Sequence, residues 1–250
     1  PHNRIKMDQD LLKMLKYLRL SGLISNFDRL LEMAETEDIS HVRWLNEIIE
    51  QEYQLKQENA RKRRISRAKI PESWLLQTFP FARQPKLNKK KVIQLYDAFD
   101  YMEQARNILF FGPTGVGKTG LATAFLIQAI DRGYNGRFIL FPELVESLYK
   151  SVADHSEEKL IKSFSKFDCL LIDELGYIEL EPVQVGLSFT LMQKRHKRKT
   201  TLITSNLGFE RWPSFLKNDH LTAALIDRLT EVSHIINLKN CVSLRPRLTS

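Results

Sequence analysis

ILFFGPTGVGKT, residues 108–119, joins four apolar residues to a glycine-rich turn that ends in Lys118 and Thr119. The turn matches G-x-x-x-x-G-K-[ST], and this full match between an apolar run and a helical segment disfavours a chance glycine-rich turn. Its glycines let backbone N–H groups turn inward around phosphates, and the next helix adds partial positive charge. We predict a loop for a nucleoside triphosphate, with Lys118 at the β- and γ-phosphates and Thr119 on Mg²⁺. The residues assigned to the nucleotide are Gly112, Pro113, Thr114, Gly115, Val116, Gly117, Lys118, Thr119 and Gly120.

Short apolar runs alternate with amphipathic segments on both sides of this loop. The apolar runs are residues 108–111, 138–141, 169–172, 202–204 and 235–236. The amphipathic segments lie near residues 119–132, 142–166, 183–197 and 221–229. Strand and helix in alternation predict an α/β fold, with a five-stranded parallel sheet covered by helices on both faces.

Polar side chains follow two of the predicted strands. LLIDE, residues 170–174, ends in Asp173 and Glu174 at the carboxyl end of a strand, where α/β folds bind ligands. We expect Asp173 to hold Mg²⁺ with Thr119, and Glu174 to orient and deprotonate an attacking water. Asn206 could contact the γ-phosphate or that water, although Asn is also a common turn residue after a strand. An acidic turn without catalytic function is the alternative for the two carboxylates.

The first 66 residues have apolar positions at helical spacing. Gly22 is expected to end one helix, and Ser40 to begin a longer helix that runs into a basic segment. Prolines then interrupt the pattern between residues 70 and 90. We predict a helical N-terminal domain for assembly or DNA binding (residues 1–69), a basic linker (70–91) and an ATPase domain (92–250).

The net charge of +8 is concentrated in one part of the chain. Residues 56–91 have a net charge of +10, whereas residues 1–55 have −3 and residues 92–250 have +1. Such a segment favours a polyanion, with a solvated helix face as the alternative. Since no helix-turn-helix or zinc-finger pattern is present, we expect duplex DNA bound with little sequence preference. The candidate DNA contacts are Arg61, Lys62, Arg63, Arg64, Arg67, Lys69, Lys194, Arg195, Lys197 and Arg198.

Cys169 and Cys241 are too few for a disulfide framework, and no apolar run reaches the roughly 18 residues that a membrane span requires. These features predict a cytoplasmic protein without a membrane partner.

Four motifs together resemble one family: GPTGVGKT, LLIDELGY (residues 170–177), TSN (204–206) and AALIDRL (223–229). They are similar to the AAA+ ATPases of the IstB type, transposition helper proteins of insertion sequences related to the DnaC and DnaI helicase loaders. The resemblance implies an AAA+ P-loop fold without a C-terminal lid, ATP and Mg²⁺ as ligands, and a hydrolytic site shared between neighbouring subunits. Arg228 matches the family's arginine finger. The residues alone would equally allow Arg228 a surface ion pair with Asp227 or Glu231.

Two further arginines come from the same comparison. Arg195 is a second candidate for an intersubunit or DNA contact. Leu244 replaces a tyrosine that relatives carry, while Arg245 keeps a basic position. Whether this C-terminal segment contacts the nucleotide or a neighbouring subunit is therefore left open.

The combined hypothesis is an ATP-dependent helper of transposition. It would form a ring or helical oligomer on duplex DNA and recruit or regulate a transposase. A DnaC-type helicase loader on single-stranded DNA, a monomeric P-loop small-molecule kinase, and a DNA-binding assembly module with vestigial hydrolysis are the alternatives.

Overall fold

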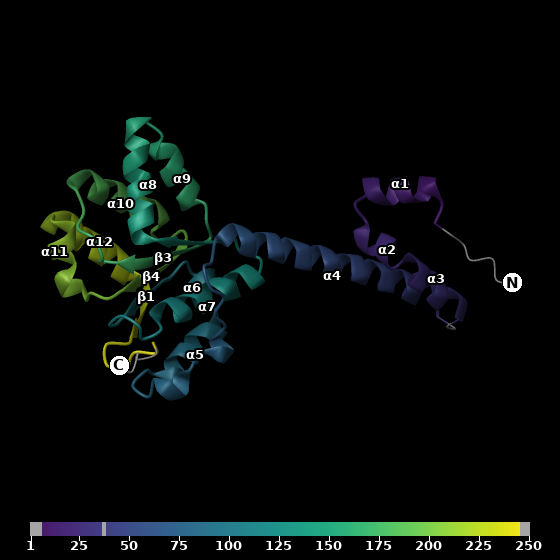
Figure 1. Cartoon of the computed structure of the whole chain (residues 1–250), viewed down its shortest axis with the longest axis horizontal. Helices are drawn as coiled ribbons and strands as arrows, with labels where there is room; N and C mark the ends of the chain where they lie inside the picture. Colours follow the sequence, from purple (N-terminus) through teal and green to yellow (C-terminus); the bar gives the residue numbers. More distant parts are fainter. Residues whose placement is uncertain (1–6, 37–38, 246–250) are drawn as a thin grey trace, which may run out of the picture. The chain divides into compact units, whose positions relative to one another are not determined.

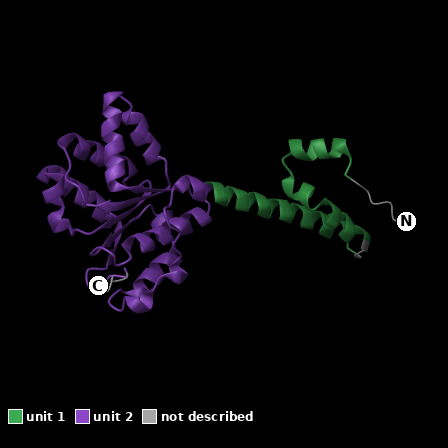
Figure 2. Ribbon diagram, viewed as in Figure 1, with its two compact units in different colours: residues 1–63 green, residues 64–250 purple. Residues whose placement is uncertain are grey.

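The computed structural model describes residues 7–36 and 39–245. The chain divides into two compact units, residues 1–63 and residues 64–250 (Figure 2). None of the helices in the described ranges combines the length and the apolar character needed to cross a membrane.

Unit 1 is helical, as the apolar spacing predicts. It contains α1 (Gln9–Tyr17), α2 (Ser21–Ser25), α3 (Phe27–Thr36) and most of α4 (His41–Ala68), which continues into unit 2. The hydroxyl of Ser40 accepts a hydrogen bond from the N–H of Arg43, as expected for an N-cap. The expectation for Gly22 is wrong, because this residue lies inside α2 and faces α4. A Cβ atom there would lie 2.8 Å from a carboxylate oxygen of Glu52 and 3.4 Å from its Cα, so the two helices approach closely at this residue.

Unit 2 is built on the predicted five-stranded sheet, in which neighbouring strands are parallel and follow the order β2-β3-β4-β1-β5. The strands are β1 (Asn107–Phe111), β2 (Gly136–Leu140), β3 (Cys169–Leu175), β4 (Thr200–Ser205) and β5 (Ser233–Asn237). β1, β3 and β4 are buried over nearly their whole length, which explains their continuous apolar runs. The fold-class prediction is confirmed.

Helices cover both faces of this sheet (Figure 1). One face packs against α5 (Lys89–Ala98), α6 (Asp100–Glu103) and α7 (Lys118–Asp131). The other packs against α8 (Phe141–Ala153), α9 (Glu157–Ser165), α10 (Pro182–Arg195), α11 (Trp212–Leu216) and α12 (Asp219–Glu231). The single helix expected near residues 142–166 is two helices. They separate at His155, whose φ of 56° is left-handed.

Residues 70–91 do not form the predicted linker. Leu76, Phe79 and Leu87 are buried in the core on the α7 side of the sheet, and Gln84 is 1% exposed. Two short 3-10 turns, Leu76–Thr78 and Phe81–Arg83, lie within this segment. The prolines interrupt the helical pattern, but the segment is packed into the core and belongs to unit 2.

The predicted exposure of Arg195 is also wrong. Its side chain is buried, and its guanidinium donates hydrogen bonds to the Thr201 hydroxyl and to three backbone carbonyls, those of Phe164, Phe167 and Thr200. Burial lowers the pKa of Arg195 to about 10, so the group stays charged at neutral pH. Arg195 therefore joins α9, α10 and β4 and is unavailable to DNA or to another subunit.

Replacing Arg195 with Ala should destabilise the protein by about 3 kcal/mol or more, since four buried acceptors would lose their charged donor. Arg198→Ala is the matched control: Arg198 is exposed nearby, and its loss should cost less than about 0.5 kcal/mol. Urea denaturation measures both free energies of unfolding. If Arg195→Ala and Arg198→Ala are equally stable and Arg195→Ala binds DNA more weakly, Arg195 is a DNA contact after all.

Candidate active site

The glycine-rich loop between β1 and α7 has a backbone that requires its glycines. Gly115 and Gly117 have φ angles of +84° and +98°, in the left-handed region that glycine adopts without strain. A Cβ atom on Gly117 would also lie 2.8 Å from the Phe79 ring, and one on Gly112 would lie 2.8 Å from the backbone of Leu238. The loop is thus packed on both sides by segments outside the motif.

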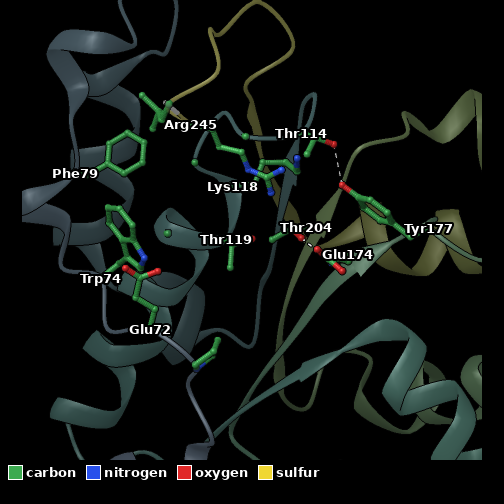
Figure 3. Close-up of a pocket in the computed structure, with 15 residues that line it drawn as sticks. Glu72, Trp74, Phe79, Thr114, Lys118, Thr119, Glu174, Tyr177, Thr204 and Arg245 are labelled. Atoms are coloured by element: carbon green, nitrogen blue, oxygen red, sulfur yellow. Dashed lines mark hydrogen bonds between the residues drawn. The ribbon is translucent and has the colours of Figure 1, made fainter. Parts of the chain in front are cut away.

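A cavity of about 460 Å³ opens beside this loop (Figure 3). Its volume is within the roughly 300–1,000 Å³ typical of small-molecule sites. It is lined by Pro71, Glu72, Trp74, Phe79, Thr114, Gly115, Gly117, Lys118, Thr119, Gly120, Glu174, Tyr177, Thr204, Leu244 and Arg245. The loop, the ends of β3 and β4, residues 71–79 and the C-terminal segment therefore meet at one site.

Lys118 begins α7 and is buried at the bottom of the loop. Its ammonium group donates a hydrogen bond to the Pro113 carbonyl at 2.8 Å, which curls the side chain back over the loop. Burial lowers the pKa of Lys118, and the nearby carboxylates of Asp173 and Glu174 oppose that shift. A buried cation with its charge turned toward the loop suits a bound phosphate.

Asp173 is the centre of a hydroxyl–carboxylate cluster. The Thr119 hydroxyl lies 3.0 Å from both of its carboxylate oxygens, and the Thr204 hydroxyl donates a further hydrogen bond to it. Burial raises the pKa of Asp173, while hydrogen bonds from Thr204 and Thr119 and the charge of Lys118 lower it. Hydroxyl and carboxylate oxygens are the hard donors that Mg²⁺ prefers, so Thr119 and Asp173 fit the predicted metal pair.

Glu174 follows Asp173 in β3 and lines the cavity. Its φ of 63° is left-handed, which interrupts the regular pairing of β3 with β4 between Ile172 and Leu175. The N–H of Glu174 donates to the Thr204 hydroxyl at 3.0 Å, which anchors this irregular backbone. The strand therefore presents one carboxylate to Thr119 and the next to the open cavity.

Thr204 replaces Asn206 as the polar residue of β4 that lines the cavity. Asn206 follows the strand and is not part of the lining, and its buried side-chain oxygen has no hydrogen-bond partner among the residues that the structure describes. TSN contains both residues, but strand register places Thr204 opposite Phe110 of β1, inside the sheet. A local sequence pattern gave no sign that the threonine would turn its hydroxyl toward Asp173.

Arg228 lies on α12 and does not line the cavity of its own chain. Its guanidinium is 4.8 Å from the centre of the Phe189 ring and donates to the Ala224 carbonyl at 3.1 Å. Glu231, one of the two proposed ion-pair partners, instead contacts Lys197 and His196. The ring holds Arg228 as a partly exposed cation beside α10.

Aromatic residues outside the loop complete the cavity. Trp74 covers Gly120, where a Cβ atom would lie 3.2 Å from the indole ring. The Tyr177 hydroxyl is hydrogen-bonded to the Thr114 hydroxyl at 3.0 Å (Figure 3). Neither aromatic contact has a signal in the sequence, because each depends on which segments the fold brings to the loop.

The candidate DNA contacts are placed differently from one another. Lys62, Arg63, Arg67 and Lys69 are exposed on or just after α4, as are Lys194, Lys197 and Arg198 near the end of α10. Arg64 is half-buried and donates to the Ile130 carbonyl. Three of these cations approach acidic residues in the part of the chain that the structure describes: Arg61 and Lys62 lie near Glu58, and Lys197 lies at Glu231.

Comparison with known proteins gives a consistent result. Residues 13–250 match the family described as IstB-like ATP binding protein. The IS5376 ATP-binding protein of Geobacillus stearothermophilus is 32% identical over 222 residues, or 89% of this chain and 88% of that protein. The IS21 ATP-binding protein of Pseudomonas aeruginosa is 29% identical over 226 residues, or 90% and 85% of the two chains. The crystal structure of the DnaC helicase loader shares the fold, with a TM-score of 0.51 and 24% identity over 60% of this chain and 90% of that one.

Replacing Thr204 with Val should lower ATP turnover by about 10- to 100-fold, because Asp173 loses a hydrogen-bond donor and the Glu174 N–H loses its acceptor. The substitution preserves the shape of the side chain, and ATP affinity should change far less than turnover. Steady-state hydrolysis and equilibrium ATP binding measure the two effects. Asn206→Ala is the comparison variant: a larger loss there than in Thr204→Val would favour the sequence-based choice of Asn206.

Proposed function

The chain belongs to the family of IstB-like ATP-binding proteins, and from that membership we propose that it is an ATPase that oligomerises on duplex DNA and recruits or regulates a transposase. The observation that carries the proposal is the cluster at the end of β3. Asp173 is hydrogen-bonded to Thr119, while Glu174 lines the cavity that also holds Lys118. A phosphate loop, a metal pair and a free carboxylate are the parts that ATP hydrolysis requires.

In the proposed reaction, the loop N–H groups and Lys118 bind the β- and γ-phosphates of ATP. Thr119 and Asp173 would hold Mg²⁺, which supplies neutralising charge to these phosphates when bound. Glu174 orients a water for attack on the γ-phosphorus and accepts its proton, and the bond to the ADP oxygen breaks. Thr204 is hydrogen-bonded to both the Asp173 carboxylate and the Glu174 N–H. It thereby keeps Asp173 at the metal position and Glu174 at the position of the water.

Arg228 would complete the site of a neighbouring subunit. It does not line its own cavity, and its partly exposed guanidinium lies over the Phe189 ring of α10. A cation delivered from a second chain stabilises charge that develops on the transferred phosphoryl group. Hydrolysis would then depend on assembly, as a switch on DNA-bound complexes requires.

Mixing two inactive variants tests this shared site. Glu174→Gln should bind ATP without turnover, and Arg228→Ala should lose most turnover. Their mixture should recover activity, since an intact Arg228 from one subunit would meet an intact Glu174 in the next. Measured ATP hydrolysis across mixing ratios reports the recovery.

A mixture of Glu174→Gln with Lys118→Ala is the control, because both changes damage the nucleotide side of the site and no interface becomes complete. Absence of recovery in the first mixture, with full activity of an unmixed monomer, would favour the small-molecule kinase. Unchanged turnover in Glu174→Gln would exclude hydrolysis by this mechanism.

The exposed cations of α4, together with Lys69 directly after it, are proposed to bind DNA phosphates. Changing Arg63, Arg67 and Lys69 together to Gln should weaken duplex binding about equally across sequences. The logarithmic salt slope should fall by up to about 0.9 for each lost phosphate contact. Fluorescence anisotropy of labelled duplexes at several salt concentrations measures both. The exposed residues Lys159, Lys162 and Lys166, changed to Gln, form a control of equal charge on α9 and the residue after it.

The same titrations with single-stranded DNA and ATP separate transposition from helicase loading. The shared fold with the DnaC loader makes this comparison necessary. Tighter binding to duplex is expected here, whereas clear preference for single strands would support the loader. Equal loss in the two triple variants would mean that general charge, rather than α4, binds DNA.

A further inference from the structure

The last described residues, 241–245, form a strap across the phosphate loop. The N–H of Leu244 donates a hydrogen bond to the Gly115 carbonyl at 2.8 Å, and Leu244 packs against the core beside the loop. Leu244 and Arg245 both line the cavity, and Arg245 lies near Lys118 at its edge (Figure 3). The strap thus contributes apolar surface and positive charge to the same opening.

Gln84 connects this strap to the loop from beneath. Its side-chain nitrogen donates to the carbonyls of Val116 and Val242, at 2.9 and 2.7 Å, and its side-chain oxygen accepts from the N–H of Val242 at 3.0 Å. Val242 is therefore paired through both of its backbone groups, as it would be in a sheet. An uncharged side chain must both donate and accept to do this, and the amide of Gln84 is 1% exposed.

We propose that Gln84 is a positioning residue for the nucleotide, which fastens the C-terminal strap over the phosphate loop so that Leu244 and Arg245 form one wall of the cavity. Gln84 itself does not line the cavity, so its influence must pass through the strap or through Val116. The inference rests on the proposed binding of ATP in this cavity. It also assigns a use to a C-terminal segment whose part in nucleotide binding the sequence left open.

The charges at the strap indicate what it would contact. Lys118 and Arg245 both line the cavity, so two positive charges meet at one opening and repel each other (Figure 3). A polyphosphate placed between them relieves that repulsion. The apolar Leu244 side chain and the rings of Trp74 and Phe79 suit the base and ribose. A nucleoside triphosphate has both a charged and an apolar part.

The test compares Gln84→Met with a chain that ends at Asn240, and with the two changes combined. Methionine keeps the length of the side chain but forms none of the three hydrogen bonds. Calorimetric titration with Mg²⁺ and the non-hydrolysable analogue AMPPNP should show about tenfold weaker binding for each single change. The combined variant should bind no more than about twofold weaker than the shortened chain. In the shortened chain Val242 is absent, so Gln84 has no strap to hold. Gln77→Met, an exposed glutamine in the same segment, is the control and should bind normally.

Hydrogen exchange without nucleotide gives an independent readout. The Leu244 amide should exchange faster in Gln84→Met, while amides of β4 stay protected and show that the fold is intact. Unchanged affinity in Gln84→Met or in the shortened chain would overturn the proposal. Substantial further weakening in the combined variant would also overturn it, since Gln84 would then act on the loop through Val116. If the unmodified chain fails to bind AMPPNP, the proposed ATP function fails, whereas the exchange result still decides whether Gln84 fastens the strap.

Discussion

Asp173 is a carboxylate that the fold buries at the end of an apolar strand, and its neighbours offset the cost of that burial. Desolvation favours its neutral form, which could not hold a metal ion. Thr119 arrives from α7 and Thr204 from β4, so two separate elements must be in place before the carboxylate is stabilised. The sheet order that puts β4 between β3 and β1 brings these groups together. The charged state of Asp173 therefore depends on the order of the strands in the sheet.

The phosphate loop supplies less of its cavity than its motif suggests. Phe79 and Trp74 contact its glycines from the segment before β1, and Leu238 packs on Gly112 from the segment after β5. Tyr177 adds a hydrogen bond from the end of β3. These contacts come from three separate segments of unit 2, so a side chain added at Gly112 or Gly117 would collide with Leu238 or Phe79. The motif fixes the loop's backbone, and the surrounding segments determine what can enter.

The sequence was sufficient to predict the sheet, the phosphate loop and the carboxylates of β3, because doubly buried strands and left-handed glycines leave local patterns. It was insufficient wherever a polar side chain forms its hydrogen bonds with groups that the fold brings from other segments. Arg195 is a charged residue in a basic run, yet acceptors from β4 and from the distant segment around α9 enclose its guanidinium. Residues 70–91 have the prolines of a linker but also apolar side chains whose burial only the core reveals. Thr204 and Asn206 are two positions apart, and only the strand pairing shows that Thr204 lies beside Asp173 while β4 ends at Ser205, before Asn206.

The hydrogen bonds between Gln84 and Val242 join residues 158 positions apart in the chain. During synthesis the ribosome produces the phosphate loop and both carboxylates well before Val242 exists. At that stage β1 also lacks its neighbour β5, so a pairing edge of the central sheet stays open. The nascent chain therefore carries every residue of the phosphate motif without a finished cavity. If the strap shapes the nucleotide site as proposed, that site is complete only after Val242 has been synthesised and has docked on Gln84.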